Sequence, residues 1–231
     1  MVASIHFGTA YFGYAFSTIS NFKLDPLKIH VNHFWNAGGR QLLTSKTPTC
    51  LLLNGSKELV LFGYEAENDY AELALDDKHH DHYYFSGFKM SLFKNKGLTE
   101  NMRLEDVTGK SILAIEVFAL SIKALKDHLL KRIETEGTGV KLHEIKWVLT
   151  VPAIWPDNAK QFMRRSASKA GIDGRNLLIA LEPEAASIYC QYLPTEKLKG
   201  ASAGFNMAGV GQKYMVIDLG GCIFCTNYNY S

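Results

Sequence analysis

Residues 2–16, VASIHFGTAYFGYAF, decide how the fold begins. Their β-branched and aromatic residues are typical of two short strands, Val2–Phe7 and Phe12–Phe16. A tight turn is predicted between them, and it consists of Gly8, Thr9 and Ala10. Successive N–H groups and a hydroxyl in a glycine turn can bind phosphate oxygens, because glycine lets another group approach the backbone closely. Taken alone, the sequence favours an ordinary hairpin turn over a phosphate site.

The rest of the chain predicts strands and helices in alternation. A second hairpin is predicted at 49–53 and 59–62, because Asn54-Gly55 tolerates positive φ in the connection. The clearest helix spans 111–134, where Ile115, Phe118 and Ile122 recur at helical spacing. Further strands are predicted at 27–34, 145–151, 177–181 and 213–219, and further helices at 63–79, 157–170 and 184–192. This order favours an α/β sheet, whereas residues 226–231 show no pattern of their own.

Two other strand ends carry residues that suit phosphate chemistry. Asp218 is followed by Gly220 and Gly221, so its carboxylate could hold Mg²⁺ through water while the glycine amides bind phosphate. Glu182 follows the strand at 177–181 and could orient a water for attack on a phosphate. Each motif also has a plain structural interpretation, since a glycine turn follows many edge strands and Glu182-Pro183 suits the first turn of a helix. Neither glycine loop carries the Lys-Ser or Lys-Thr of a P-loop.

Composition and charge exclude several classes of protein. The 231 residues include 25 Lys and Arg against 23 Asp and Glu, and their scattering argues against nucleic-acid partners and anionic membrane surfaces. No apolar run reaches the roughly 18 residues that predict a membrane span. The cysteines are too few and too irregularly spaced for a disulfide framework, and they fit a reducing, cytoplasmic setting: Cys50, Cys190, Cys222 and Cys225.

Residue types that bind metals gather near the end of the helix predicted at 63–79. They are Asp77, His79, His80, Asp81 and His82. These residues could form a metal site, but adjacent histidines on an exposed helix end are expected to point in different directions, so the pattern favours an ordinary exposed helix end.

Together these motifs resemble the heat shock protein 70 and actin superfamily of ATPases, most closely its heat shock protein 70 family member 12 branch, from about Val2 to Gly221. His6-Phe7-Gly8-Thr9 resembles the first phosphate loop of that family, and Asp218-Leu219-Gly220-Gly221 resembles the opening of the second. Phe88-Lys89-Met90 resembles the segment that presents the catalytic lysine. The end of the central strand resembles the family at Val151-Pro152-Ala153-Ile154-Trp155, and the glutamate-proline connector resembles it at Glu182-Pro183-Glu184-Ala185-Ala186.

The resemblance implies a fold class and a domain organisation. It implies an α/β, actin-like (ribonuclease H-like) lobe with a mixed sheet and flanking helices, plus a smaller inserted subdomain. The lobe would span residues 1–221, the subdomain about 30–110, and a divergent tail 222–231.

The resemblance also implies roles for individual residues. Lys89 would contact the γ-phosphate region, Glu182 would serve the attacking water, and Asp218 would hold Mg²⁺ through water. The phosphates of ATP or ADP would bind at the two loops, at Gly8, Thr9, Ala10, Gly220 and Gly221. Without the resemblance, Lys89 would be interpreted as a solvated lysine whose stem lies beside Phe88 and Phe93.

Departures from the family pattern predict a weakened site. His6 stands where the family has an aspartate, and an imidazole does not supply the negative charge that Mg²⁺ prefers. Cys222 and Ile223 stand where the second loop has glycine and threonine, so a positive-φ turn is disfavoured and a hydroxyl is lost. The second lobe of the family does not follow this loop, so we also expect a truncated protein.

These observations predict a truncated nucleotide-binding protein of a chaperone family, with at most weak ATP binding and little or no hydrolysis by itself. Phosphoryl transfer depends on groups that close from both sides, so turnover would require a partner chain that supplies the missing lobe. The alternative is a non-catalytic interaction or regulatory module derived from such an ATPase, with protein partners of its own.

Overall fold

A mixed β-sheet lies at the centre of the molecule. The structure is a computed structural model that describes residues 1–35, 44–94, 99, 101–193, 213–219 and 224–230. The central strands run in the order β11-β10-β1-β2-β3, and a short strand β4 also pairs with β2. Their bounds are β1 Val2–Phe7, β2 Tyr11–Ser17, β3 His30–Val31, β4 Lys46–Pro48, β10 Lys146–Val151 and β11 Leu177–Leu181. β1, β10 and β11 are parallel to one another, whereas β2 runs antiparallel to β1.

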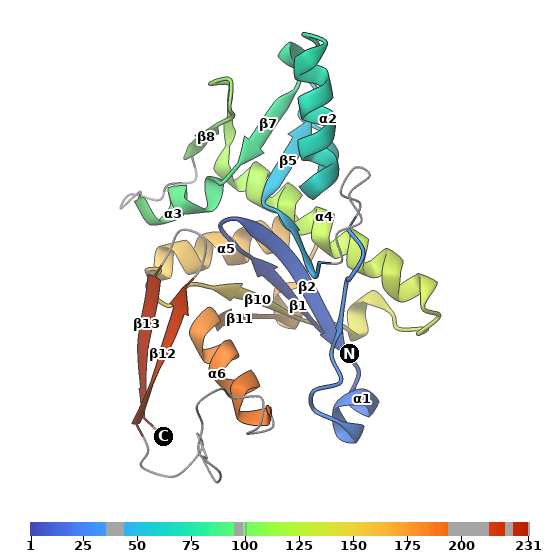
Figure 1. Ribbon diagram of the computed structural model, residues 1–231, viewed down its shortest axis with the longest axis vertical. Coiled ribbons are helices and arrows are strands. Elements are labelled where there is room, and N and C mark those ends of the chain that lie inside the picture. Colours follow the sequence, from blue (N-terminus) through green and yellow to red (C-terminus); the bar gives the residue numbers. More distant parts are fainter. Residues whose placement is uncertain (36–43, 95–98, 100, 194–212, 220–223, 231) are drawn as a thin grey trace.

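One face of this sheet carries the core. Ala3, Ile5 and Phe7 alternate along β1 and are buried, as period-two side chains on one face of a strand should be. Helix α4 (Ala114–Thr135) covers this face, and the ring of its Phe118 stacks on Phe7 at 5.1 Å between centroids. Helix α5 (Asp157–Lys169) packs beside α4 on the same side of the sheet (Figure 1).

The opposite face of the sheet is more open. Val2 and Leu178 point to it and are 46% and 60% exposed. Helix α6 (Glu182–Tyr192) lies on this side, next to a hairpin of β12 (Lys213–Leu219) and β13 (Phe224–Tyr230), while the small helix α1 (Ile19–Leu24) follows β2 (Figure 1).

A second, smaller sheet stands at one end of the central one (Figure 1). Its order is β6-β5-β7, with β5 at Cys50–Leu53, β6 at Leu59–Phe62 and β7 at Tyr83–Ser86. Leu51 and Leu53 belong to the main core, whereas Cys50 and Leu52 pack with Ala66 of helix α2 (Gly63–Leu75). Smaller elements complete this part: η1 His79–Asp81, η2 Phe88–Met90, α3 Ser91–Lys94, β8 Arg103–Glu105 and β9 Ser111–Leu113.

The expected fold class is confirmed, because the structure has a mixed sheet with flanking helices and a smaller appended sheet. The boundaries predicted for the lobe, the subdomain and the tail stay a prediction. Several element predictions need correction. Of the strand expected at 27–34, the structure has the two-residue strand β3 and a single bridge residue, Phe34. Residues 111–113 form β9 before α4 begins. Residues 226–230, for which the sequence predicted no element, belong to the strand β13 (Phe224–Tyr230).

Candidate functional site

The candidate site lies at the edge of the central sheet where the parallel strands end. β1 ends at Phe7, β10 at Val151 and β11 at Leu181, so Gly8, Pro152 and Glu182 begin three neighbouring connections. In open α/β sheets, ligands bind outside the carboxyl ends of the strands. The predicted phosphate turn and the predicted catalytic glutamate therefore share the edge at which a ligand is expected.

The turn at Gly8, Thr9 and Ala10 is fixed by Thr49, which lies between β4 and β5. The hydroxyl of Thr49 donates to the carbonyl oxygen of Gly8 at 2.8 Å, and the backbone N–H of Thr49 donates to the carbonyl oxygen of Ala10 at 2.9 Å. A Cβ added at Gly8 would lie 2.2 Å from the carbonyl oxygen of Tyr11. The glycine is thus required by close packing of the turn against its own backbone.

Replacing Gly8 with alanine is expected to destabilise the protein by about 2 kcal/mol or more, because the backbone of the turn must move to admit the methyl group. The matched control is Gly174→Ala, since nothing lies within 4 Å of a Cβ at Gly174. Urea denaturation of both variants measures the difference. Equal stability of the two variants would contradict the close packing described for the turn.

His6 lies beside this turn, on the open face of β1. Its Nδ1 lies 3.1 Å from the hydroxyl oxygen of Thr150, which is its partner in the β1–β10 register. Its Nε2 lies 2.9 Å from the position that a Gly8 Cβ would take. An imidazole and a hydroxyl therefore occupy the place at which the family resemblance implies a carboxylate. The partner Thr150 was not predicted from the sequence.

Lys89 and Glu182 meet at the same edge. The Nζ of Lys89 donates to Oε1 of Glu182 at 2.8 Å, and their side chains are only 3% and 15% exposed. Lys89 belongs to η2, which begins after Gly87 in a left-handed conformation with φ 60°. The N–H of Gly87 donates to the carbonyl oxygen of Thr49 at 3.3 Å. Thr49 thus connects the segment that carries Lys89 to the glycine turn.

Trp155, part of the motif at the end of β10, is a further neighbour of the lysine, and the sequence did not predict this contact. The Nζ of Lys89 lies 5.4 Å from the centroid of the Trp155 ring, within the range of a cation–π contact. Trp155 is 2% exposed, and its Nε1 has no hydrogen-bond partner within the part of the chain that the structure describes. The interpretation of Lys89 as a solvated surface lysine is therefore wrong, because its ammonium group is buried between an acid and an aromatic ring.

The second predicted loop is described only in part. Asp218 lies in β12, opposite Cys225 of β13. Gly220, Gly221, Cys222 and Ile223 lie outside the described residues. Thr9 and Ala10 lie in the first turn, which the structure places at the site edge.

The residues at this edge fit one part of the expected ligand better than the other. A buried ammonium group beside a glycine turn suits the negatively charged oxygens of a phosphate. Mg²⁺ prefers carboxylate and water ligands, and the hydrogen-bonded pair His6 and Thr150 offers an imidazole and a hydroxyl instead. The donor set therefore agrees with a phosphate and disagrees with a tightly held Mg²⁺ near His6.

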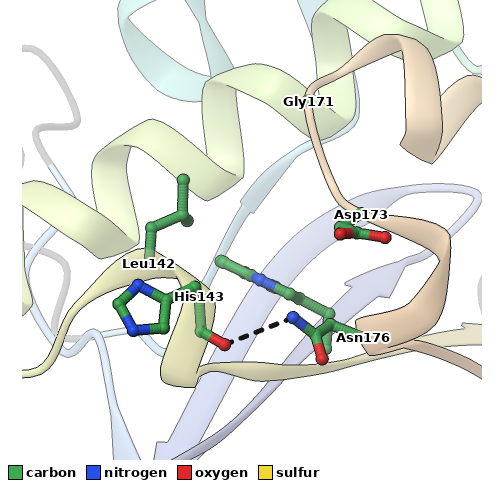
Figure 2. A pocket seen from close by; sticks show the side chains of 6 residues that line it. Leu142, His143, Gly171, Asp173 and Asn176 are labelled. Atoms are coloured by element: carbon green, nitrogen blue, oxygen red, sulfur yellow. Dashed lines mark hydrogen bonds between the residues drawn. The ribbon is translucent and has the colours of Figure 1, made fainter.

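A separate pocket lies at the other end of the parallel strands (Figure 2). Its volume is about 330 Å³, and its lining comes from the start of β10 and the segments before β10 and β11: Leu142, His143, Trp147, Gly171, Asp173 and Asn176. The Nδ2 of Asn176 donates to the carbonyl oxygen of His143 at 3.3 Å across its mouth. The position at the amino ends of the strands is opposite to the edge at which α/β sheets bind ligands.

Known proteins similar to this chain are longer than the chain itself. Heat shock 70 kDa protein 12B of Homo sapiens is 42% identical over 203 residues, which are 86% of this chain. Heat shock 70 kDa protein 12A is 38% identical in Homo sapiens and 39% in Mus musculus, over 84% of this chain in each case. The chain is a homologue of the heat shock 70 kDa proteins 12A and 12B. It spans 29% of the length of these relatives.

The sequence identity to heat shock 70 kDa proteins 12A and 12B thus confirms the family resemblance drawn from the motifs. No protein-family model matches the chain. Among solved structures, the chain is similar to MreB5 of Spiroplasma citri bound to ADP, with 14% identity and a TM-score of 0.49, over 98% of this chain and 47% of that one. None of the helices in the described part of the chain has the length and apolar character that crossing a membrane requires.

Proposed function

We propose that this chain binds the phosphates of ATP weakly, as one wall of a heat shock protein 70-like nucleotide site, with little or no hydrolysis by itself. The observation that carries the proposal is the buried ammonium group of Lys89, which is held by Glu182 and connected through Thr49 to the glycine turn. The homology to heat shock 70 kDa proteins 12A and 12B supports it.

Weak binding follows from the partner that Lys89 already has. A phosphate oxygen that approached Lys89 would compete with the carboxylate of Glu182, which accepts from Nζ at 2.8 Å. The first turn of α6 favours a charged carboxylate at Glu182, because helix N-termini stabilise negative charge. Part of the phosphate interaction would therefore replace an existing one instead of adding to it.

Slow or absent hydrolysis follows from the acids at the site. Glu182 could orient a water molecule only after its carboxylate has been released from Lys89. The negative charge of a transferring phosphoryl group also requires cations that clamp it, and Mg²⁺ supplies this charge when bound. His6 offers no carboxylate to hold the metal's water shell, so the chain's own residues favour binding over turnover.

Calorimetric titration with ATP and Mg²⁺ tests the proposal. Wild-type protein is expected to bind with a Kd on the order of 0.1–1 mM. Glu182→Gln is expected to bind more tightly, because Lys89 loses the negative charge that competes with phosphate. Lys89→Gln is expected to bind about tenfold more weakly or worse, as loss of a charge-assisted hydrogen bond implies.

Matched controls separate this result from unfolding. Lys123 is exposed and pairs with Asp127 at 2.6 Å on α4, so Lys123→Gln should leave ATP binding unchanged. Tighter binding by Glu182→Gln cannot result from a loss of folded protein. Equal affinities of wild type, Lys89→Gln and Glu182→Gln would contradict the proposed site, and steady turnover of ATP by the isolated chain would contradict the proposed lack of hydrolysis.

Replacing His6 with aspartate is expected to strengthen binding of Mg²⁺ and ATP together by about tenfold, which is on the order of 1.4 kcal/mol. The new carboxylate would lie beside the glycine turn and supply the charge that hard Mg²⁺ prefers. His6→Asn is the control, because it is polar and of similar size but carries no charge. The gain should disappear when EDTA removes the metal, and a gain that persists in EDTA would contradict the explanation.

A second candidate function is an interaction module without nucleotide chemistry. It is favoured by apolar side chains that are exposed where α1 approaches α6, with the rings of Phe22 and Tyr192 at 6.5 Å between centroids. Ile19, Leu24 and Ile188 nearby are between 56% and 76% exposed. We infer that a second copy of the chain could cover this patch. Sedimentation velocity tests this: a concentration-dependent dimer that Phe22→Ser abolishes is expected, and a monomer at all concentrations would contradict it.

A further inference from the structure

We propose that Asp77, His79 and His80 form a binding site for Zn²⁺ or a similar divalent transition-metal ion. The three residues belong to the connection between α2 and β7. These two elements stand beyond one end of the central sheet (Figure 1). Their ligand atoms all lie within 4.8 Å of one another. Two imidazoles and one carboxylate form a donor set that suits zinc, and Asp77 and His80 are exposed to solvent.

The backbone of the connection explains why these side chains converge. α2 ends at Leu75, and Asp77 takes a left-handed conformation with φ 58°, which reverses the chain. The N–H of Lys78 donates back to the carbonyl oxygen of Leu73 at 2.8 Å, so this reversal is tied to the last turn of the helix. The 3-10 turn η1 then presents His79 and His80 on the same side as Asp77.

The side-chain distances are close to those of a bound state. The rings of His79 and His80 are 4.3 Å apart between centroids, and Nε2 of His80 lies 3.0 Å from Oδ1 of Asp77. Two ligand atoms of a tetrahedral zinc ion lie about 3.4 Å apart, because each zinc–ligand bond is about 2.0–2.1 Å long. The cluster therefore needs to close by about 1.4 Å at most, which rotation of exposed side chains can supply.

His79 has a ring nitrogen that lacks a partner within the described residues. Its Nδ1 is buried and has no hydrogen bond to any residue that the structure describes. A buried polar atom without a partner is costly, and an ion bound through this nitrogen would provide one. The ring of His79 also meets Tyr70 of α2 at 5.9 Å between centroids, which limits the orientations it can take.

The charges around the cluster favour binding of a cation with moderate affinity. Within residues 76–82, three aspartates stand against a single lysine, Lys78, which pairs with Asp76 at 2.8 Å. The C-terminal end of α2 adds the negative end of a helix dipole. Lys110 acts in the opposite direction, since its ammonium group donates to the carbonyl oxygens of His80 and His82. Because imidazole is a poor ligand for hard cations, Mg²⁺ and Ca²⁺ should not compete.

The sequence pattern predicted that adjacent histidines would point in different directions, and for His79 and His80 this is wrong. That expectation assumed a continuous α-helix, in which successive side chains are separated by about 100°. The chain is not a continuous α-helix here, because Asp77 has a left-handed backbone and η1 is a tighter turn.

Metal titration of the full chain tests the site. Isothermal titration with Zn²⁺ is expected to show one equivalent bound in the micromolar range, and the melting temperature should rise by about 5 °C at 100 times the Kd. Mg²⁺ should give neither effect. Substitution with Co²⁺ should give visible d–d bands without the intense near-ultraviolet band of a thiolate ligand, which separates this site from the cysteines.

Variants assign the binding to these residues. His79→Ala, His80→Ala and Asp77→Asn should each weaken Zn²⁺ binding by about tenfold or more, and asparagine tolerates the left-handed backbone that Asp77 adopts. His33→Ala is the control, because His33 is exposed and lies elsewhere in the chain. Retention of wild-type affinity by His79→Ala and His80→Ala, or a Co²⁺ spectrum dominated by thiolate bands, would overturn the proposal, as would no binding below 1 mM Zn²⁺.

Discussion

Phe118→Ala is expected to lower the free energy of unfolding by about 3–5 kcal/mol. Phe118 is fully buried in α4, and its ring contacts Phe7 of β1, Phe88 of η2 and Phe162 of α5. The centroid distances are 5.1, 5.2 and 5.4 Å, so one ring joins the central sheet, the lysine segment and the second helix of the core. No single neighbour can fill the resulting cavity without breaking another of these contacts.

Urea denaturation with a two-state fit measures this loss. The matched control is Phe93→Ala, because Phe93 is 42% exposed on α3 and its truncation should cost about 1 kcal/mol or less. A loss below about 1.5 kcal/mol for Phe118→Ala would show that the ring is not the centre of the core.

Lys89→Met is expected to lower the free energy of unfolding by about 3 kcal/mol. The substitution leaves the carboxylate of Glu182 without its partner at a site where only 15% of that side chain is exposed. Methionine keeps most of the volume of lysine, so the cost reports the unpaired charge more than a cavity. This loss is smaller than that of a fully buried ion pair with one partner removed, because the remaining exposure of Glu182 lets water reach its carboxylate.

A double-mutant cycle isolates the interaction. The pair Lys89→Met and Glu182→Gln should be more stable than the sum of the single losses predicts, with a coupling of about 2 kcal/mol, because the double variant leaves neither charge unpaired. Chemical denaturation of the four proteins gives this coupling. If the losses in free energy of unfolding are additive, the 2.8 Å contact between Lys89 and Glu182 does not contribute to stability in solution.

The elements that could be predicted from the sequence are those with a strong local pattern. The hairpin of β1 and β2, the long helix α4 and the strand β10 each have the hydrophobic period of their class, and the structure contains all three. The strand expected at 27–34 is shorter in the structure, because its continuous pairing with β2 is limited to His30 and Val31. β13 was missed because its pairing with β12 is a tertiary contact, although Phe224, Tyr228 and Tyr230 are residues that favour strands.

The candidate site depended more on resemblance than on local pattern. Nothing in the sequence around Lys89 indicates that its side chain is buried, and its partner Glu182 is 93 residues away. The contact of Trp155 with Lys89 was not predicted for the same reason. Thr150 was not predicted as the partner of His6, because that contact depends on the register of β1 against β10. An alternating strand could have shown that Thr150 and Val148 share a face, but it does not reveal which strand lies next to that face.

We propose that Lys89 lies where the phosphates of ATP bind, and an ATP acyl-phosphate probe tests this position most directly. Such a probe transfers its acyl group to a lysine amine that lies beside the bound phosphates, and peptide mass spectrometry identifies the lysine that has reacted. We expect labelling of Lys89 that excess ATP suppresses, while exposed lysines such as Lys123 react equally with and without ATP. Labelling confined to exposed lysines, with no protection by ATP, would contradict it.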